Sequence, residues 1–264
     1  MLSAQSFDAV AKMFHRVSGI RLTEAKRALV EGRLQKLARN RGEDNLDRYV
    51  QTLLAENDPA ELVRVVDKLT TNETYFFREP QHFDFLADWL DHRPQGGTNL
   101  RVWSAASSSG EEAYSLAMLL ANKFGLRGWE IVGTDLSTAM VEAARQALYP
   151  LERARHVAAT DLKRWCLKGQ GDFSGQLLIS RELRERVRFE TANLMQPLPD
   201  LGQFDVVFLR NVLIYFDTAA KADIMRRVMT CLKPDGLLFT GHAESIANLA
   251  LPLRTLAPAV HARA

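Results

Sequence analysis

Hydrophobic residues recur with a helical period through the N-terminal part of the chain. Helical patterns cover roughly residues 5–17, 23–41, 46–56 and 59–69, and Gly19, Gly42 and Pro59 separate them. This part of the chain contains no convincing strand pattern. Residues 1–69 are therefore predicted to be helical.

The pattern changes at residue 100. An apolar run over 100–103 predicts a buried strand, and small residues over 104–110 predict a loop. A helix is predicted to begin near Glu111, because one helical face collects Ala113, Leu116, Ala117, Leu120, Ala121 and Phe124. Strand, small-residue turn and helix together are typical of the mononucleotide-binding unit of a doubly wound α/β fold.

The next predicted strand, 130–133, is followed by Asp135, about where such folds place the carboxylate that binds ribose hydroxyls. The preceding turn has one glycine, Gly110, whereas a dinucleotide fingerprint needs three, and no P-loop lysine follows it. These features favour a nucleoside with a small charged tail, such as S-adenosylmethionine. The acids Glu111 and Glu112 open the helix. Either they serve only the helix dipole, or one of them faces the ammonium group of the ligand.

The remainder of the chain continues the α/β pattern. Residues 138–165 are predicted to be largely helical, and glycines within 166–190 suggest a small β-hairpin insertion. Strands over 187–194 and 204–211 end in the polar residues Asn193 and Arg210, which places their carboxyl ends on one rim of the sheet. A helix over 219–231, a turn at 233–236, a strand over 236–242 and a tail hairpin from 251 complete the prediction.

Composition limits the function classes. The 264 residues are 47% hydrophobic and 25% charged, which is ordinary for a globular protein, and a net charge of +2 does not indicate nucleic-acid binding. Neither a signal peptide nor an apolar run near the roughly 20 residues of a membrane span is present. Cys166 and Cys231 have no metal-ligand spacing. We therefore expect a cytoplasmic protein without membrane insertion or a metal.

Positive charge is concentrated in the second helical segment. Between Arg21 and Arg41 there are seven basic residues against two acids, Glu24 and Glu31. Val30, Leu34 and Leu37 provide a packing stripe, so the charges must point elsewhere. The basic face is either a solvated surface or a docking surface for an acidic partner.

Several motifs together resemble the chemotaxis receptor glutamate O-methyltransferases, the CheR family. They are TTNETYFFRE (70–79), RVWSAASSSGEEAYSLAM (101–118), GTDLS (133–137), FDVVFLRNVLIYFD (204–217) and LKPDGLLFTGHAES (232–245). The motifs occur in the family's order and spacing, so the resemblance covers nearly the whole chain. Ser109 and Ala113 replace a threonine and a proline that are common in the family's turn.

The resemblance implies three parts: an all-helical N-terminal domain (1–69), a linker (70–90), and a Rossmann-like S-adenosylmethionine domain (91–264) with an antiparallel β-subdomain near 166–190. It also implies methylation of glutamate side chains on the cytoplasmic domain of chemoreceptors, with S-adenosyl-L-homocysteine as product. In some members the β-subdomain binds a tethering peptide at the receptor C-terminus. Nothing in these residues shows whether this chain does so.

The resemblance also implies roles for individual residues. The linker residues Asn72, Thr74 and Arg78 would close over the cofactor. Glu112, Asp135, Asn193, Leu194, Arg210 and Asn211 would bind it, with Asp135 on the ribose and Asn193 and Leu194 on the adenine side. In the second helix, Arg33 and Arg39 would face the receptor.

The implied chemistry needs little acid–base help. A glutamate, with a pKa near 4.3, is already an anionic nucleophile at neutral pH, so proximity and alignment are the main requirements. We expect Arg78 to orient a carboxylate and Tyr215 to border the methyl group, although Tyr215 would also suit a core aromatic position. His82 and His242 have no obvious acidic partner in the sequence and are expected to be structural.

Two alternative functions remain. The first is an O-methyltransferase for another carboxylate or a small-molecule hydroxyl, although such a substrate needs no basic docking face. The second is a non-catalytic S-adenosylmethionine-binding regulator of signalling. The joint presence of Arg78, Glu112, Asp135, Arg210 and Tyr215 disfavours the regulator.

Overall fold

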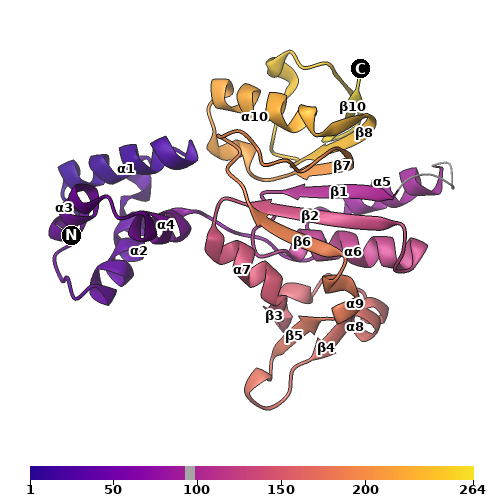
Figure 1. Cartoon of the computed structure of the whole chain (residues 1–264), viewed down its shortest axis with the longest axis horizontal. Helices are drawn as coiled ribbons and strands as arrows, with labels where there is room; N and C mark the ends of the chain where they lie inside the picture. The colour runs from indigo at the N-terminus through magenta and orange to yellow at the C-terminus, as the bar shows by residue number, and fades with distance from the viewer. Residues whose placement is uncertain (93–98) are drawn as a thin grey trace.

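The computed structural model describes residues 1–92 and 99–264. Four helices form a bundle at the N-terminus: α1 (Ala4–Ser18), α2 (Arg27–Asn40), α3 (Leu46–Glu56) and α4 (Pro59–Leu69). The bundle has its own core, which includes Phe14, Leu34 and Leu53. It lies to one side of the rest of the molecule (Figure 1). Within the described residues, no helix is long and apolar enough to span a membrane.

Local sequence signals explain where these helices begin and end. Asn45 caps α3 by accepting hydrogen bonds from two backbone amides, and Asp58 caps α4 directly before Pro59. Gly19 ends α1 in the left-handed conformation, with φ of 73°. The predicted helix over 23–41 is a 3-10 turn (Glu24–Lys26) followed by α2.

The C-terminal part is built on a seven-stranded sheet in the order β6-β2-β1-β7-β8-β10-β9. Five neighbouring strands are parallel: β6 (Val187–Thr191), β2 (Trp129–Asp135), β1 (Leu100–Ala105), β7 (Phe204–Leu209) and β8 (Leu232–Thr240). The tail adds β9 (Leu253–Ala257) and β10 (Val260–Arg263) as an antiparallel hairpin beside β8. The predicted turn at 233–236 lies inside β8, at an irregularity in its pairing with β7.

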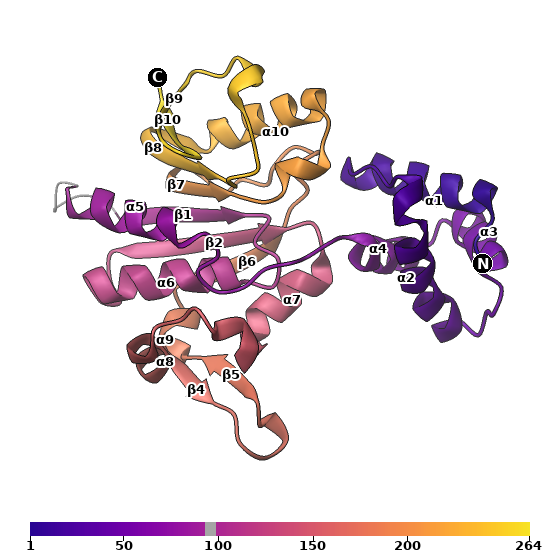
Figure 2. The same cartoon turned by 180° about the vertical axis from the view of Figure 1, so that it is seen from behind.

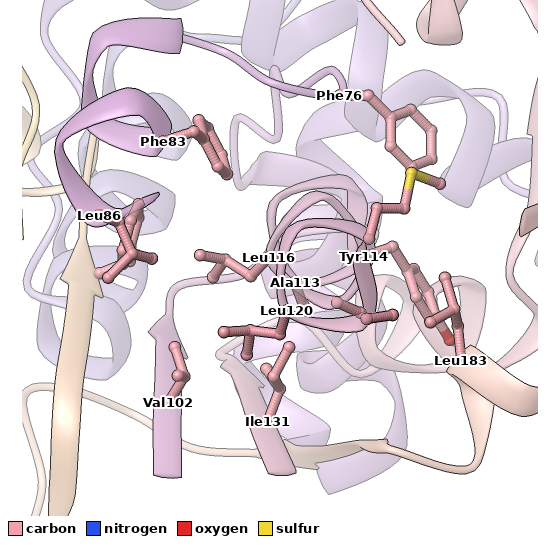
Figure 3. Packing of buried hydrophobic residues seen from close by; sticks show 14 of the residues in the cluster. Phe76, Phe83, Leu86, Val102, Ala113, Tyr114, Leu116, Leu120, Ile131 and Leu183 are labelled. Atoms are coloured by element: carbon pink, nitrogen blue, oxygen red, sulfur yellow. The ribbon is translucent and has the colours of Figure 1, made fainter. Parts of the chain in front are cut away.

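Helices cover both faces of this sheet. The helices α5 (Pro80–Asp91), α6 (Glu111–Phe124) and α7 (Thr138–Gln146) cover one face, and α10 (Thr218–Thr230) covers the other (Figures 1 and 2). Successive residues of β1 point to opposite faces of the sheet. Val102 therefore packs with α5 and α6, whereas Trp103 packs with α10. Figure 3 shows Leu116 and Leu120 of α6 between α5 and the strands.

A small antiparallel sheet, in the order β3-β5-β4, projects from the α6 side (Figure 1). It consists of β3 (Leu148–Pro150), β4 (Cys166–Lys168) and β5 (Gln176–Ile179), with the short helices α8 (Ala159–Trp165) and α9 (Arg181–Arg184) beside it. The hairpin predicted within 166–190 supplies only β4 and β5. The third strand, β3, interrupts the segment 138–165 that was predicted to be largely helical. Its three residues are too few to show a period, and only pairing with β5 makes them a strand.

Candidate cofactor cavity

A cavity of about 880 Å³ lies at the carboxyl ends of the parallel strands, beside the point where the strand order reverses between β1 and β7. Ligands of doubly wound folds bind at this position. The cavity is lined by the linker, the turn after β1, and the segments after β2, β6 and β7. All ten residues predicted for the cofactor or catalysis line it: Asn72, Thr74, Arg78, Glu112, Asp135, Asn193, Leu194, Arg210, Asn211 and Tyr215.

The turn after β1 contributes Ala106, Ser107 and Ser108 to the lining of the cavity. Ala106, Ser108 and Gly110 all have positive φ, of 60°, 50° and 95°, so the chain turns sharply between β1 and α6. A Cβ atom on Gly110 would lie 2.9 Å from the Ala144 Cβ. Glycine at this position is therefore required both for its conformation and for close packing of the turn.

The two acids that open α6 have different environments. Glu111 is completely buried and pairs with Ser109 and Arg153, and it does not contribute to the cavity lining. Glu112 lines the cavity, accepts a hydrogen bond from Ser104 at 2.7 Å, and pairs with Arg210 at 2.9 Å. Burial raises the pKa of Glu112, and the Arg210 charge opposes that rise. Of the two acids, Glu112 is the one whose side chain is available to a ligand in the cavity.

Asp135 lies at the end of β2 and is buried. Its Oδ2 accepts a hydrogen bond from the Ser108 amide at 2.8 Å, and its Oδ1 accepts one from the Ser137 amide at 2.9 Å. Burial raises the pKa of Asp135, and these amides lower it. The carboxylate therefore has a fixed orientation at the cavity wall, as a ligand for ribose hydroxyls requires.

Asn193 and Leu194 follow β6 and form the wall nearest to the helical bundle. The Asn193 side chain donates to the Val17 carbonyl at 2.7 Å and accepts from the Met195 amide at 2.9 Å. It therefore fastens the rim of the cavity to the end of α1. Leu194 is buried and contributes an apolar surface that suits an aromatic base.

Arg210, at the end of β7, connects three parts of the site. Its guanidinium is 1% exposed, pairs with Glu112 and with Glu79 at 2.9 Å each, and donates to the Arg78 carbonyl. Glu79 also accepts a hydrogen bond from the Asn211 side chain at 3.1 Å. No role for Glu79 was predicted from the sequence. Its only signal was its place beside Arg78 in the linker motif.

Arg78 and Tyr215, the two predicted catalytic residues, face the same cavity. Arg78 is half-buried and donates to the Glu73 carbonyl at 2.8 Å. Burial raises the pKa of the half-buried Tyr215, and the nearby Arg78 charge opposes that rise. The Lys26 ammonium lies 5.5 Å from the centre of the Tyr215 ring, so the basic segment begins at the mouth of the cavity. Lys26 was counted in the sequence only as one of several basic residues.

The histidines differ from the prediction. His82 and His242 were expected to lack an acidic partner, but both Nδ1 atoms approach Glu79 Oε2, at 3.4 and 3.5 Å, and the rings lie 4.5 Å apart. The reason is tertiary: the start of α5 and the loop after β8 meet behind the cavity. Burial lowers the pKa of His82 to about 4, so its ring is neutral at pH 7.

The two arginines predicted to dock a receptor are not equivalent. Arg39 is exposed near the end of α2. Arg33 is half-buried and donates to the carbonyls of Leu69 and Thr70, at 2.8 and 3.2 Å. Arg33 therefore holds the start of the linker, which its sequence position did not reveal.

Comparisons with known proteins agree with this architecture. Residues 72–257 match the S-adenosylmethionine-binding domain of CheR methyltransferases, and residues 5–70 match the all-alpha domain of the same family. The chain is 39% identical to a chemotaxis protein methyltransferase of Salmonella typhimurium, over 94% of this chain and 86% of that protein. It is 36% identical to chemotaxis protein methyltransferase 2 of Pseudomonas aeruginosa, over 98% of this chain and 93% of that protein.

Together the two matches cover both parts of the chain. Most residues around the cavity belong to the S-adenosylmethionine-binding match, and Ser18, Ile20 and Thr70 belong to the all-alpha match. The side chains that line the cavity also fit the cofactor: the partly buried carboxylate of Glu112 for an ammonium group, the buried carboxylate of Asp135 for ribose, and an apolar wall for adenine. The chain belongs to the CheR methyltransferase family, whose catalytic domain binds S-adenosylmethionine.

Proposed function

We propose that this protein methylates glutamate side chains on the cytoplasmic domain of chemoreceptors. The observation that supports this most strongly is the position of Arg78 and Tyr215, which line the cofactor cavity while Lys26 of the basic segment lies over Tyr215. A carboxylate that enters here meets cations on the way to the reacting atoms. This arrangement suits an acidic protein surface better than a neutral small molecule.

Each part of the cavity has a proposed role in binding. Glu112 would pair with the cofactor's ammonium group, and Asp135 would hold its ribose hydroxyls. Leu194 would pack on the adenine with Asn193 beside it, and Asn72 and Thr74 of the linker would cover the cofactor. Arg210 would hold Glu112 in place through their ion pair, with Asn211 next to it on the same wall.

The reaction would require alignment more than acid–base catalysis. When bound, S-adenosylmethionine supplies an electrophilic methyl group, which a carboxylate oxygen attacks while the carbon–sulfur bonding pair leaves on sulfur. Arg78 would present a planar guanidinium to the incoming carboxylate and fix its direction of attack. Tyr215 would border the methyl group and exclude water from it. A glutamate carboxylate is ionised at neutral pH, so no side chain has to remove a proton.

The test combines labelled cofactor with the proposed substrate. The protein is incubated with tritiated S-adenosylmethionine and receptor-containing membranes, and base-labile methyl esters are measured. We expect label on the receptor band, and none on a receptor whose methylated glutamates are replaced by alanine. Cofactor binding without receptor label would indicate a non-catalytic regulator, and label only on small acids would indicate a different O-methyltransferase.

A further inference from the structure

The segment after β7, residues 210–215, supplies Arg210, Asn211, Val212 and Tyr215 to the cavity wall. Its backbone departs from regular secondary structure. Asn211 has φ of 57°, in the left-handed region, and a 3-10 turn over Leu213–Tyr215 follows directly. Asparagine adopts this region more readily than other non-glycine residues, so the conformation is permitted by the side chain. The backbone amides of the segment find their partner in another loop.

Glu244, in the loop after β8, accepts four backbone hydrogen bonds. Its Oε2 receives the Asn211 amide at 2.8 Å and the Gly241 amide at 2.6 Å. Its Oε1 receives the Leu213 amide at 2.6 Å and the Ile214 amide at 3.3 Å. Glu244 is 6% exposed and is absent from the cavity lining, so it contacts the segment from behind.

Gly241 allows this contact. A Cβ atom at position 241 would lie 2.7 Å from the Asn211 Nδ2, 2.8 Å from the Glu244 Oε2 and 2.9 Å from the Asn211 backbone nitrogen. Real Cβ atoms essentially never come this close to a neighbouring atom, so any side chain would push the carboxylate and Asn211 apart. Gly241 has no positive φ, and the requirement for glycine at this position is therefore one of space.

The neighbouring cluster of Glu79, His82 and His242 has the spacing of a cation site, since its ligand atoms lie within 4.8 Å of one another. Charge argues against that role. The oxygen that both imidazoles approach, Glu79 Oε2, also binds the Arg210 guanidinium at 2.9 Å. A divalent cation bound there would be repelled by the buried positive charge of Arg210. Glu79 is held instead by its ion pair with Arg210, and it accepts a hydrogen bond from the Asn211 side chain.

We propose that Glu244 and Gly241 form a backbone clamp that positions residues 210–215 for methyl transfer. The clamp fixes the left-handed turn at Asn211 and thereby sets where the Tyr215 side chain enters the cavity. Glu244 touches neither the cavity nor the reacting atoms, so it is a positioning residue. The predicted effect on rate rests on the proposed methyltransferase function, whereas the predicted effect on backbone protection does not.

The direct test is Glu244→Gln. In either orientation of the amide, an NH₂ group would face two backbone N–H donors, so two of the four hydrogen bonds are lost and replaced by repulsion. We expect the amides of residues 211–214 to exchange with deuterium at least about tenfold faster. We also expect kcat to fall at least about tenfold while the affinity for S-adenosylmethionine changes less than about threefold, because Glu112, Asp135 and Leu194 lie on other elements.

The matched control is Asp205→Asn. Asp205 is a buried carboxylate at the other end of β7, where it accepts the Arg101 amide at 2.8 Å and pairs with Lys233 at 2.9 Å. Asp205→Asn should lower the melting temperature without a selective increase in the amide exchange of residues 211–214. Unchanged exchange in Glu244→Gln, or a kcat within about twofold of the control variant, would overturn the clamp.

A second variant, Gly241→Ala, tests the clamp if the glutamine variant does not fold. It retains every hydrogen-bonding group but inserts a methyl group between Glu244 and Asn211, and we expect the same exchange and the same selective loss of kcat. Wild-type exchange at 211–214 in a folded Gly241→Ala protein would refute the proposal. Hydrogen exchange needs no receptor, so it tests the clamp even if the wild-type protein methylates none.

Discussion

The Lys26 ammonium lies over the Tyr215 ring, 5.5 Å from its centre, and so joins the beginning of the basic α2 segment to the mouth of the cofactor cavity. An ion pair between Arg21 and Asp217, at 2.9 Å, connects the same two regions. The basic residues of α2 therefore extend away from the proposed reaction site along one helix. We expect an acidic receptor surface to lie along this helix while one glutamate enters beside Tyr215.

Arg39→Glu tests the docking surface alone. Arg39 is exposed, and reversing its charge should slow receptor methylation about two- to fivefold in low salt, because exposed charge pairs contribute only about 0–1 kcal/mol each. The defect should shrink as salt screens the charges, and cofactor affinity should not change. Methylation rates at two ionic strengths, beside calorimetry of cofactor binding, provide the measurement. A wild-type rate in low salt would make Arg39 part of a solvated surface only.

Arg33→Glu should have a different effect. Arg33 donates to the Leu69 and Thr70 carbonyls, where the linker begins, so its reversal should disturb the linker as well as the docking surface. We expect cofactor affinity to fall by about three- to tenfold, the scale for losing one or two hydrogen bonds, and salt to restore methylation only in part. If calorimetry shows unchanged cofactor affinity, Arg33 contributes to docking alone, and its contact with the linker has no effect on the cofactor site.

Arg78→Ala should separate catalysis from cofactor binding. If Arg78 orients the substrate carboxylate, turnover should fall by about a hundredfold or more while cofactor affinity changes little, because the contact matters most in the transition state. Arg78→Lys should rescue poorly, since an ammonium group cannot offer a planar pair of donors. Steady-state rates and calorimetry on the same preparations are the measurement. Parallel losses of turnover and affinity would show that Arg78 holds the cofactor instead.

Asp135→Ala should weaken S-adenosylmethionine binding by about 1–3 kcal/mol, the cost of removing a partner of buried hydrogen-bonded groups. Asp67→Ala is the matched control. Asp67 of α4 accepts a hydrogen bond from Thr138, the first residue of the helix α7 that follows Asp135, but it is absent from the cavity lining. Calorimetry should show a loss of affinity only for Asp135→Ala. Equal affinities of the two variants would exclude Asp135 from the ribose contact.

His82 should make stability depend on pH. Burial, and then the Arg210 charge, lower the pKa of His82 from 6.5 to about 4. Between these values the unfolded chain binds a proton that the folded protein does not, so the free energy of unfolding falls as pH falls through this range. The contribution is at most about 3 kcal/mol.

The free energy of unfolding, measured with denaturant at pH 7 and at about pH 4, shows the size of this effect. His82→Gln should flatten the pH dependence, whereas His92→Gln, at the exposed end of the same helix, should leave it unchanged. A His82→Gln protein that loses stability with pH as steeply as the wild type would assign the effect to other groups.

Local signals in the sequence were sufficient for most elements of the fold. The helices α3 and α4 begin and end at the predicted residues, because Asn45, Asp58 and Pro59 act on neighbouring backbone groups. The buried strands β1 and β7 were visible as apolar runs. The strand β3 was not visible, because its conformation depends on pairing with β5 rather than on its own three residues.

The residues of the cavity likewise differ in whether local sequence signals could identify them. Asp135 was predicted without reference to any family, since its place at a strand end follows from the order of elements along the chain. A helix period alone could not distinguish Glu111 from Glu112, and only the family resemblance pointed to Glu112. The tertiary contacts separate the two acids, because Glu111 pairs with Arg153 and Glu112 pairs with Arg210.

Residue patterns along the chain were enough to predict the helical domain, the α/β pattern, the turn after β1 and the polar ends of the strands, because each follows from interactions between near neighbours. The contacts by which Glu79 and Glu244 hold the segment after β7, and by which Lys26 reaches Tyr215, could be seen in the folded protein alone. Those contacts join segments far apart in the chain. They arise when parallel strands bring their carboxyl ends to one edge and the helical bundle packs beside it.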